Sequence, residues 1–414
     1  MRKTNKTAEV QDSDIPSGHL ASLSIHDFKS LKQVNVELGQ VNVFVGANGS
    51  GKSCLLEAVG ILGACASGVV DDQALLRRGV RPGVPELYKS SFSNETTAPK
   101  ISLRVTSGEG VDYHAYITNP TRRPSPQWTF GNETLKHQSR VIASRGPRGD
   151  ASALGSSIPL ENNRSVTTLL RARQDTPAAV RAILAVLDDF AIFAPVTPVL
   201  RGIAPDTAPR SPVGLYGGQL PEAVGLLLAQ ESRSPILAEA LRLVDWAATI
   251  TVGQPSRRFL SASVPTSRFV VEFRDRFMAK GRDRLSGYDA SEGALYVLFA
   301  LVLALSGPRV FAIDNFDQAL NPRTARALTR AFVDHVLQSE RQALLTTHNP
   351  LVLDGLALDD PRVRLFTVSR DRSGRTRVLR VPVKDFATLK EKHGEFAVSR
   401  LWLAGRLGGM PTDV

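Results

Sequence analysis

The fold of this chain follows from eight consecutive residues, Gly46-Ala47-Asn48-Gly49-Ser50-Gly51-Lys52-Ser53. They match the phosphate-binding pattern G-x-x-x-x-G-K-[ST] at every position. The apolar run 41–45 before them predicts a strand, and the apolar run 54–62 after them predicts a helix. In that setting the glycines let backbone N–H groups close around phosphates, and the start of the helix adds its positive end. The stretch therefore predicts a nucleotide site in an α/β fold.

Two side chains of this loop have predicted chemical roles. We expect Lys52 to reach the β- and γ-phosphates of a nucleotide, and the Ser53 hydroxyl to bind Mg²⁺. The expected cofactors are therefore ATP and Mg²⁺, with all eight residues of the loop lining the nucleotide.

The composition excludes several classes of protein. The chain has 414 residues, enough for two or three domain-sized units. No uninterrupted apolar run is long enough to span a bilayer, and the N-terminus lacks the apolar region of a signal peptide. Cys54 and Cys65, the only cysteines, form no zinc-binding pattern. We expect a reduced, cytoplasmic protein with no membrane partner.

The formal net charge of +11 is unevenly spread along the chain. Residues 361–406 contain twelve basic and four acidic residues, a net charge of +8. A basic surface favours nucleic acid or another polyanion as a partner. An arginine-rich solvated face predicts the same composition, so both interpretations stay open here.

The pattern along the chain divides it into four segments. Residues 1–19 read as a flexible N-terminus, and residues 20–118 as the first part of the α/β core with the phosphate loop. Residues 119–280 read as an inserted lobe, loop-rich to about 163 and then helical. Residues 281–414 read as the second part of the core with a basic tail. Strands that alternate with helices after a phosphate loop predict an α/β fold with a largely parallel sheet.

Three later segments add polar groups to the predicted site. The apolar strand 310–313 ends at Asp314, the usual place for a carboxylate that positions the Mg²⁺ shell. The apolar strand 343–347 ends at His348, which we expect to face the γ-phosphate. Ser291 and Gly293 open a strongly apolar helix, and such a start offers a second anion site.

The order Lys52, Ser291, Asp314, His348 resembles the Walker A, signature, Walker B and switch-histidine order of ABC-type ATPases. The opening LSIHDFKSLKQVNVELGQVNVFVGANGSGKS is similar to their bacterial branch related to the overcoming-lysogenization-defect, recombination-mediator and SMC-like ATPases. The resemblance covers roughly residues 20–90 and 280–370. It implies an ABC-type P-loop ATPase head with a mixed, largely parallel sheet and an inserted helical lobe.

The resemblance also implies an assembly. Two heads would sandwich two ATP molecules, so that Lys52 of one head and Ser291 of the other hold the same triphosphate. We therefore expect a homodimer or a higher even-numbered oligomer. The loop 318–323 stands where such ATPases contact the second head, although an ordinary Asn-Pro helix start explains it equally well.

The chain departs from the family pattern after the Walker B strand. The usual Asp-Glu is replaced by Asp314-Asn315, with Asp317 two residues further on. An asparagine cannot accept a proton, so either Asp317 or His348 activates water, or hydrolysis is slow and ATP mainly locks the dimer. Gln73 is the candidate for the metal ligand that the family places in its glutamine loop. The stretch 285–287 imitates a transporter signature, but we prefer Ser291 because the helix is expected to begin there.

Several functions fit this sequence. The chain carries no recognisable nuclease pattern, so the first hypothesis is a sensor ATPase of a bacterial antiphage-defence system that controls a separately encoded nuclease or other effector. The alternative is a DNA-repair or chromosome-maintenance clamp that binds DNA without an effector. A transporter ATPase and a nucleotide-locked scaffold are weaker candidates. Nucleic acid is a possible partner in the first two.

Overall fold

The computed structural model describes residues 18–93, 95–125, 127–230, 234–256, 263–264, 267–382 and 397–408. The predictions for residues 1–17, and for the basic residues of 383–396, fall outside these ranges.

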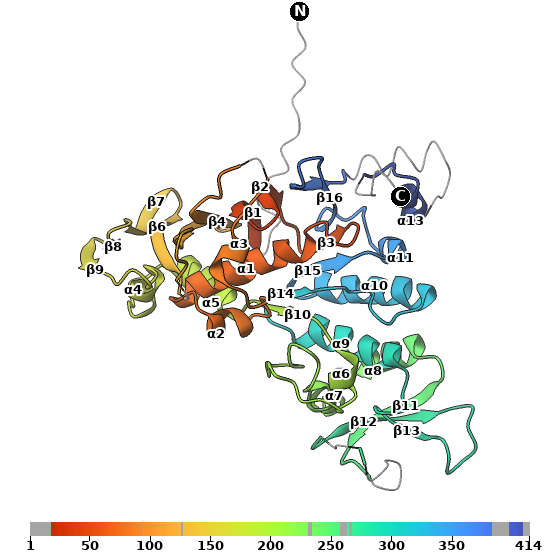
Figure 1. Ribbon diagram of the computed structural model, residues 1–414. Helices are drawn as coiled ribbons and strands as arrows, with labels where there is room; N and C mark the ends of the chain where they lie inside the picture. The colour runs from red at the N-terminus through yellow and green to blue at the C-terminus, as the bar shows by residue number, and fades with distance from the viewer. Residues whose placement is uncertain are drawn as a thin grey trace, which may run out of the picture.

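A six-stranded sheet forms the centre of the molecule (Figure 1), in the order β10-β14-β15-β3-β16-β17. All neighbouring strands are parallel except the last pair. The strands are β3 (Val41–Val45), β10 (Ala191–Phe193), β14 (Val310–Ile313), β15 (Gln342–Thr347), β16 (Val363–Arg370) and β17 (Thr376–Arg380). The prediction of a mixed, largely parallel sheet is confirmed.

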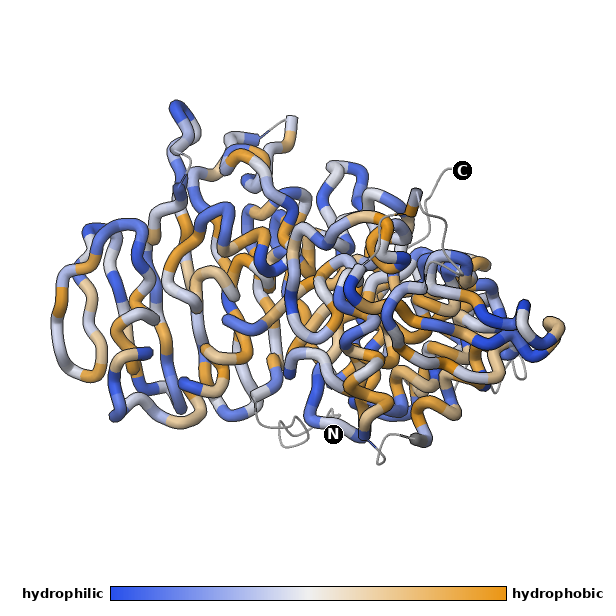
Figure 2. Tube along the Cα trace, turned by 90° about the horizontal axis from the view of Figure 1, so that it is seen from below, coloured by the Kyte–Doolittle hydropathy of each residue, from blue (hydrophilic) through white to orange (hydrophobic). Residues whose placement is uncertain are grey.

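Both faces of this sheet are buried, which explains its continuous apolar strands. Successive side chains of a strand point to opposite faces. Phe44 therefore joins one hydrophobic cluster, whereas its neighbours Val43 and Val45 join the other. The apolar helix α9 (Glu292–Ser306) packs in the second cluster and is buried on nearly all sides. Figure 2 shows these apolar segments gathered in the interior.

A second sheet has eight antiparallel strands in the order β2-β1-β4-β5-β6-β7-β8-β9. The strands are β1 (Leu20–Phe28), β2 (Leu31–Glu37), β4 (Lys100–Ser107), β5 (Val111–Thr118), β6 (Thr129–His137), β7 (Arg140–Arg145), β8 (Asp150–Ala153) and β9 (Ser156–Pro159). The prediction that residues 119–163 are mainly loops was therefore wrong. β6 to β9 continue the sheet that β1 and β4 begin.

One buried carboxylate explains why the strand pattern of this region was missed. Glu133 of β6 points inward at a position where an apolar residue is expected, and it is 1% exposed. It accepts hydrogen bonds from Tyr113 (2.8 Å), Ser165 (2.6 Å) and the Val166 amide (2.9 Å). A buried charge is tolerated only with such partners. The polar side chain therefore hides a strand from a purely apolar pattern.

The helices of the described residues fall into three groups, two for the core and one for a separate lobe. The first group is α1 (Lys52–Ser67), α2 (Asp72–Leu76), α3 (Pro85–Tyr88), α4 (Thr167–Arg171) and α5 (Ala178–Asp189). The second is α9, α10 (Pro322–Leu337), α11 (Pro350–Leu353) and α13 (Val398–Leu403). The third forms a lobe at the lower end of the view in Figure 1, with α6 (Thr197–Leu200), α7 (Leu220–Leu228), α8 (Ser234–Leu243) and the small sheet β11 (Ala247–Gly253), β12 (Val270–Asp275) and β13 (Arg284–Ser286). The domain limits at 119 and 281 stay a prediction.

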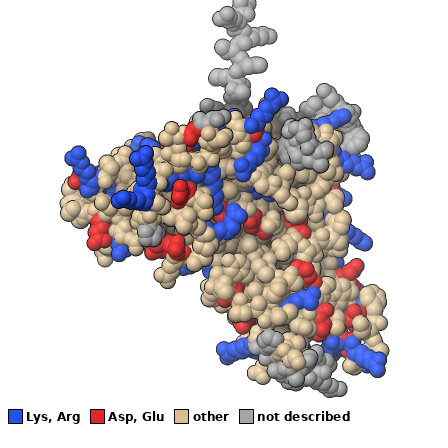
Figure 3. Space-filling model, viewed as in Figure 1, with Lys and Arg blue, Asp and Glu red and all other residues tan. Residues whose placement is uncertain are grey.

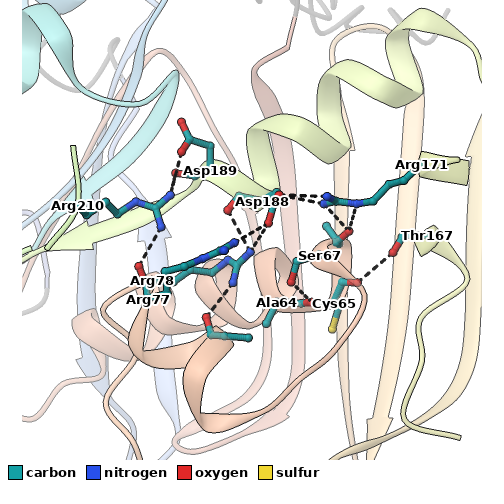
Figure 4. Close-up of polar contacts among 12 residues, drawn as sticks. Ala64, Cys65, Ser67, Arg77, Arg78, Thr167, Arg171, Asp188, Asp189 and Arg210 are labelled. Atoms are coloured by element: carbon teal, nitrogen blue, oxygen red, sulfur yellow. Dashed lines mark hydrogen bonds and ion pairs between the residues drawn. The ribbon is translucent and has the colours of Figure 1, made fainter. Parts of the chain in front are cut away.

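A charge network ties the end of α5 to the segment that follows α2 (Figure 4). The Asp188 carboxylate accepts hydrogen bonds from Arg78 (2.6 Å), Arg77 (3.0 Å) and Arg171 (3.2 Å). Arg78 is fully buried and also bonds the Ala74 carbonyl (2.8 Å). Because Arg171 bonds the Ala66 carbonyl near the end of α1 (2.9 Å), the same network fixes the helix that begins at the phosphate loop.

None of the helices in the described part of the chain has both the length and the apolar content needed to cross a bilayer.

Candidate nucleotide site

The phosphate loop lies between β3 and α1, and two of its glycines are required by close neighbours. A Cβ on Gly46 would lie 2.1 Å from the Val368 carbonyl oxygen of β16. A Cβ on Gly51 would lie 2.3 Å from the Thr376 hydroxyl, and Gly51 has a φ of 109°. Any larger residue would push the loop off the neighbouring strands. The loop is thus seated against the β16–β17 hairpin.

The β16–β17 hairpin also holds the loop by hydrogen bonds that sequence analysis missed. Arg370 Nε donates to the Gly49 carbonyl (2.9 Å), and the Thr376 hydroxyl donates to the Ser50 carbonyl (2.8 Å). Both contacts go to the main chain of the loop, so no side-chain pattern within the loop could have pointed to them. Sequence analysis counted Arg370 only as part of a basic tail.

Lys52 lies folded over the loop. Its ammonium group donates to the carbonyls of Gly46 (2.8 Å) and Ala47 (2.9 Å). Burial lowers the pKa of Lys52, while the nearby carboxylates of Asp314 and Asp317 act to raise it. The structure therefore places a cationic side chain within the loop, next to a pair of acidic groups.

Ser53 and Asp314 meet at the end of β14, as the sequence predicted. Ser53 Oγ donates to the two carboxylate oxygens of Asp314 at 2.8 and 3.1 Å. The Thr346 hydroxyl of β15 donates to the same carboxylate. A hydroxyl and a carboxylate side by side next to a phosphate loop are oxygen donors of the kind that Mg²⁺ prefers. These residues fit a nucleotide-bound Mg²⁺, although their role as ligands stays a prediction.

Asn315 has an unusual backbone conformation, with a φ of 57°. Its N–H donates to the Thr346 hydroxyl (2.9 Å), and its carbonyl accepts from the Tyr296 hydroxyl (3.3 Å). Its side chain is exposed. Asparagine tolerates the left-handed conformation better than most residues. This backbone requirement gives one physical reason for an asparagine here.

Asp317 and His348 form a pair beside Asn315. Asp317 is 7% exposed and accepts a hydrogen bond from the Thr347 hydroxyl (2.7 Å). His348 Nε2 lies 3.5 Å from Asp317 Oδ2, and the imidazole is 52% exposed. The structure thus brings together two groups able to accept a proton, one buried and one open to solvent.

Ser291 begins α9, which confirms the predicted helix start. Its hydroxyl caps the helix by accepting a hydrogen bond from the Ala294 amide (3.3 Å). A Cβ on Gly293 would lie 3.0 Å from the Ala319 carbonyl oxygen, so glycine allows the loop 318–323 to approach. Ser291 and this loop line a cavity of about 90 Å³ together with Trp246. The surroundings of Ser291 are therefore the lobe and the loop before α10.

The segment before α9 is braced from α6, a contact without a sequence signal. Arg201 donates to the carbonyls of Tyr288 (2.8 Å) and Ala290 (3.2 Å). The Thr197 hydroxyl bonds the Glu292 carboxylate in the first turn of α9. These contacts fix the position of Ser291 relative to the lobe.

A second ion-pair cluster lies beside the start of α1. Glu57 is 2% exposed and binds Lys29 (2.6 Å) and Arg81 (2.7 Å). Burial alone would raise the pKa of Glu57, but the hydrogen bonds from Arg81 and the charge of Lys29 outweigh it and lower that pKa. The single carboxylate within the apolar run 54–62 could have pointed to this cluster, but the sequence analysis did not use it. Gln73, the predicted metal ligand, lies exposed in α2, and its role stays a prediction.

The comparisons with known proteins agree with this geometry. Residues 22–130 match a family described as "AAA domain", and residues 251–354 match one described as "AAA domain, putative AbiEii toxin, Type IV TA system". The chain is also 35% identical over 106 residues to a "DNA replication and repair protein RecF" of Paenarthrobacter aurescens (strain TC1). The protein of the same description from Renibacterium salmoninarum is 44% identical over 106 residues. Each match spans 25% of this chain and 26% of the relative.

The fold has a solved counterpart. An SMC head, solved in complex with the C-terminal winged-helix domain of ScpA, superposes with a TM-score of 0.51 at 12% identity and covers 89% of this chain and 99% of that one. Two segments of the chain are thus similar to AAA domains and one to RecF proteins, and the chain has the fold of an SMC head. The loop 46–53, Ser53 and Asp314 are the groups whose chemistry fits a nucleoside triphosphate and Mg²⁺.

Proposed function

We propose that this ATPase works as a dimeric switch that closes on ATP and opens after hydrolysis. The main support is that the phosphate loop and Ser291 lie on different parts of the molecule. The phosphate loop is seated on the β16–β17 hairpin, whereas Ser291 faces the lobe and the loop 318–323. A second copy that presents Ser291 to the triphosphate would complete the site. Such an isologous pair contains two identical composite sites.

A mixing experiment tests the composite site. Lys52→Ala removes the loop cation, and Ser291→Asp keeps the helix cap but places a negative charge where the triphosphate of the partner would lie. Each variant alone should lose ATP turnover. An equimolar mixture should recover about a quarter of native turnover, because half of the dimers are mixed and each has one intact site. Absence of recovery, with both variants folded and dimeric, would refute the composite site.

We further propose that turnover is slow, and that the Asp317–His348 pair supplies the proton acceptor. Asn315 offers no carboxylate, whereas Asp317 lies 3.5 Å from an exposed imidazole. General base catalysis contributes about 10²- to 10⁴-fold. The double variant Asp317→Asn/His348→Ala should therefore fall to the turnover of Lys52→Ala. Native-like turnover in this variant would remove the pair from the mechanism.

The switch would serve as the sensor of a bacterial antiphage-defence system and control a separately encoded nuclease or other effector. The match of residues 251–354 to an AAA domain described with a putative AbiEii toxin supports this assignment. The RecF relatives support the alternative equally well, a DNA-repair or chromosome-maintenance clamp. Both assignments place the protein in the cytoplasm, where its free cysteines would stay reduced.

Two cellular measurements separate these assignments. The first is phage plating on cells that carry the gene together with its neighbouring genes, compared with the same cells carrying Lys52→Ala. Protection that Lys52→Ala abolishes supports defence. The second is survival of a deletion strain after DNA damage. Sensitivity to damage without any phage protection would support the repair clamp and refute the defence assignment.

A further inference from the structure

The tip of the β12–β13 hairpin, residues 276–283, leaves two large apolar side chains exposed to solvent. Phe277 is 79% exposed and Met278 is 51% exposed. Figure 1 shows this hairpin at the lower end of the lobe, far from α1. Single exposed apolar residues are normal on a protein surface, so these two adjacent ones become informative only together with the charge of the same tip.

The same tip carries a surplus of positive charge. Residues 276–283 contain three basic residues and one acidic residue. The basic ones are Arg276, Lys280 and Arg282, and their side chains are exposed. Figure 3 shows lysine and arginine side chains at this end of the molecule. Apolar and cationic groups therefore share one surface.

The tip is built by its own hydrogen bonds. Asp275 Oδ1 accepts from the Phe277 amide (2.8 Å), and Asp283 Oδ1 accepts from the Gly281 amide (3.1 Å). Arg276 also anchors the base of the loop by donating to the Ala247 carbonyl (2.7 Å). The backbone at Phe277 is thus held in place, so little backbone entropy is lost when the tip binds.

We propose that this tip is a nucleic-acid contact in which Phe277 and Met278 pack against bases while Lys280 and Arg282 bind the flanking phosphates. Apolar side chains that stack on or wedge between bases, next to arginines and lysines on the backbone, are a common mode of nucleic-acid binding. An anionic bilayer would be held by a much larger apolar face, such as that of an amphipathic helix. Two apolar side chains fit a base stack better.

The tip is also connected to the signature segment. β13 leads directly to the turn in which the Ala290 amide bonds the Ser286 carbonyl (2.9 Å), one residue before Ser291. On the other side, the Arg276 amide bonds the Trp246 carbonyl (3.0 Å), and Trp246 lines the cavity at Ser291. A bound strand would therefore act on the surface that meets the second head. This coupling rests on the proposed composite site, whereas the nucleic-acid contact itself does not.

Binding is measured by fluorescence anisotropy with a labelled single strand of about 16 nucleotides and with the matching duplex. All measurements are made without ATP, so failure of the ATPase mechanism leaves this test unaffected. The variants are Phe277→Ala and Lys280→Ala. Matched controls are Leu226→Ala, whose side chain is 68% exposed on α7, and Arg140→Ala on β7. These positions are solvent-exposed, so the four variants should fold.

Phe277→Ala should weaken binding of at least one probe by about 5- to 100-fold, the range that loss of one stacked base gives. Lys280→Ala should reduce the slope of log affinity against log salt by about 0.7 for the single strand or 0.9 for the duplex. The controls should bind like the native protein. Native affinity of Phe277→Ala for both probes would overturn the proposal. Binding to vesicles of equal parts phosphatidylserine and phosphatidylcholine is measured as well. If Phe277→Ala weakens binding to these vesicles but to neither nucleic-acid probe, the proposal is also overturned.

Discussion

The substitution Asp188→Asn should destabilise the protein strongly. The Asp188 carboxylate faces three guanidinium groups, and one of them, Arg78, is fully buried. Burial and the neighbouring charge of Arg77 already lower the pKa of Arg78 to about 10, and Asp188 opposes this shift. Asparagine keeps one acceptor oxygen but removes the negative charge that pairs with Arg78. Breaking a buried pair in this way costs about 3–5 kcal/mol.

We expect the lower end of that range, about 3 kcal/mol, because Asp188 is 28% exposed and partly screened by water. The next residue supplies a matched control. Asp189 pairs with Arg210 at 2.9 Å, and its side chain is 65% exposed, whereas that of Arg210 is 12% exposed and also donates to the Asp189 carbonyl. Because Arg210 keeps the carbonyls of Arg77 and Asp189 as acceptors, Asp189→Asn should cost about 1 kcal/mol or less.

The assay is urea unfolding followed by circular dichroism, with the midpoints of both variants compared at a common m-value. A cost below about 1 kcal/mol for Asp188→Asn would refute the reasoning, since surface pairs reach that value. Equal costs for Asp188→Asn and Asp189→Asn would show that burial of Arg78 does not decide the outcome.

Three further changes have defined outcomes. Gly46→Ala should weaken binding of a fluorescent ATP analogue at least tenfold, because its Cβ would lie 2.1 Å from the Val368 carbonyl. Gly49→Ala has open space around its Cβ, so its strain of about 1–2 kcal/mol should lower folding stability while the ATP analogue binds more tightly than it does to Gly46→Ala. Equal loss of binding in the two variants would contradict this. Asn315→Asp should raise kcat in steady-state ATPase assays by about tenfold or more by restoring a carboxylate that tolerates the same backbone conformation, and an unchanged kcat would show that no carboxylate is needed there. Burial raises the pKa of Glu133 above 4.5 in the folded protein. Between pH 4.5 and that raised value, the Glu133 carboxyl is ionised in the unfolded chain but still protonated in the native protein. The free energy of unfolding therefore falls as the pH rises through this range. Glu133→Gln should reduce this loss in urea unfolding series, and an identical pH slope would exclude Glu133 as its source.

The core of the fold was predictable because its signals are local and strong. The strand before the loop is buried on both faces, so Val41–Val45 reads as an unbroken apolar run, and the motif directly after it fixes its place in the sheet. Asp314 follows another such strand and indeed meets Ser53. The antiparallel sheet was missed beyond β5 because Glu133 interrupts the apolar alternation with a buried charge. Only its partners, far along the chain, make that charge acceptable.

The rest of the candidate site depends on contacts that leave no mark in a motif. Arg370 and Thr376 bond main-chain carbonyls of the phosphate loop, so any loop of this shape would accept them. Arg201 likewise bonds two carbonyls before Ser291. Such residues become visible only when the fold brings distant segments together.

The contacts between the phosphate loop and the β16–β17 hairpin have a consequence during translation. β3 lies between β15 and β16, and Ser50 is held by Thr376, which stands 326 positions later in the chain. A ribosome adds about 5–20 residues per second, so roughly 15 to 65 s pass between synthesis of the loop and synthesis of its support. During that interval the nascent chain has the phosphate-binding motif without the strands that shape it. We therefore expect nucleotide binding to begin only on chains translated past the β16–β17 hairpin.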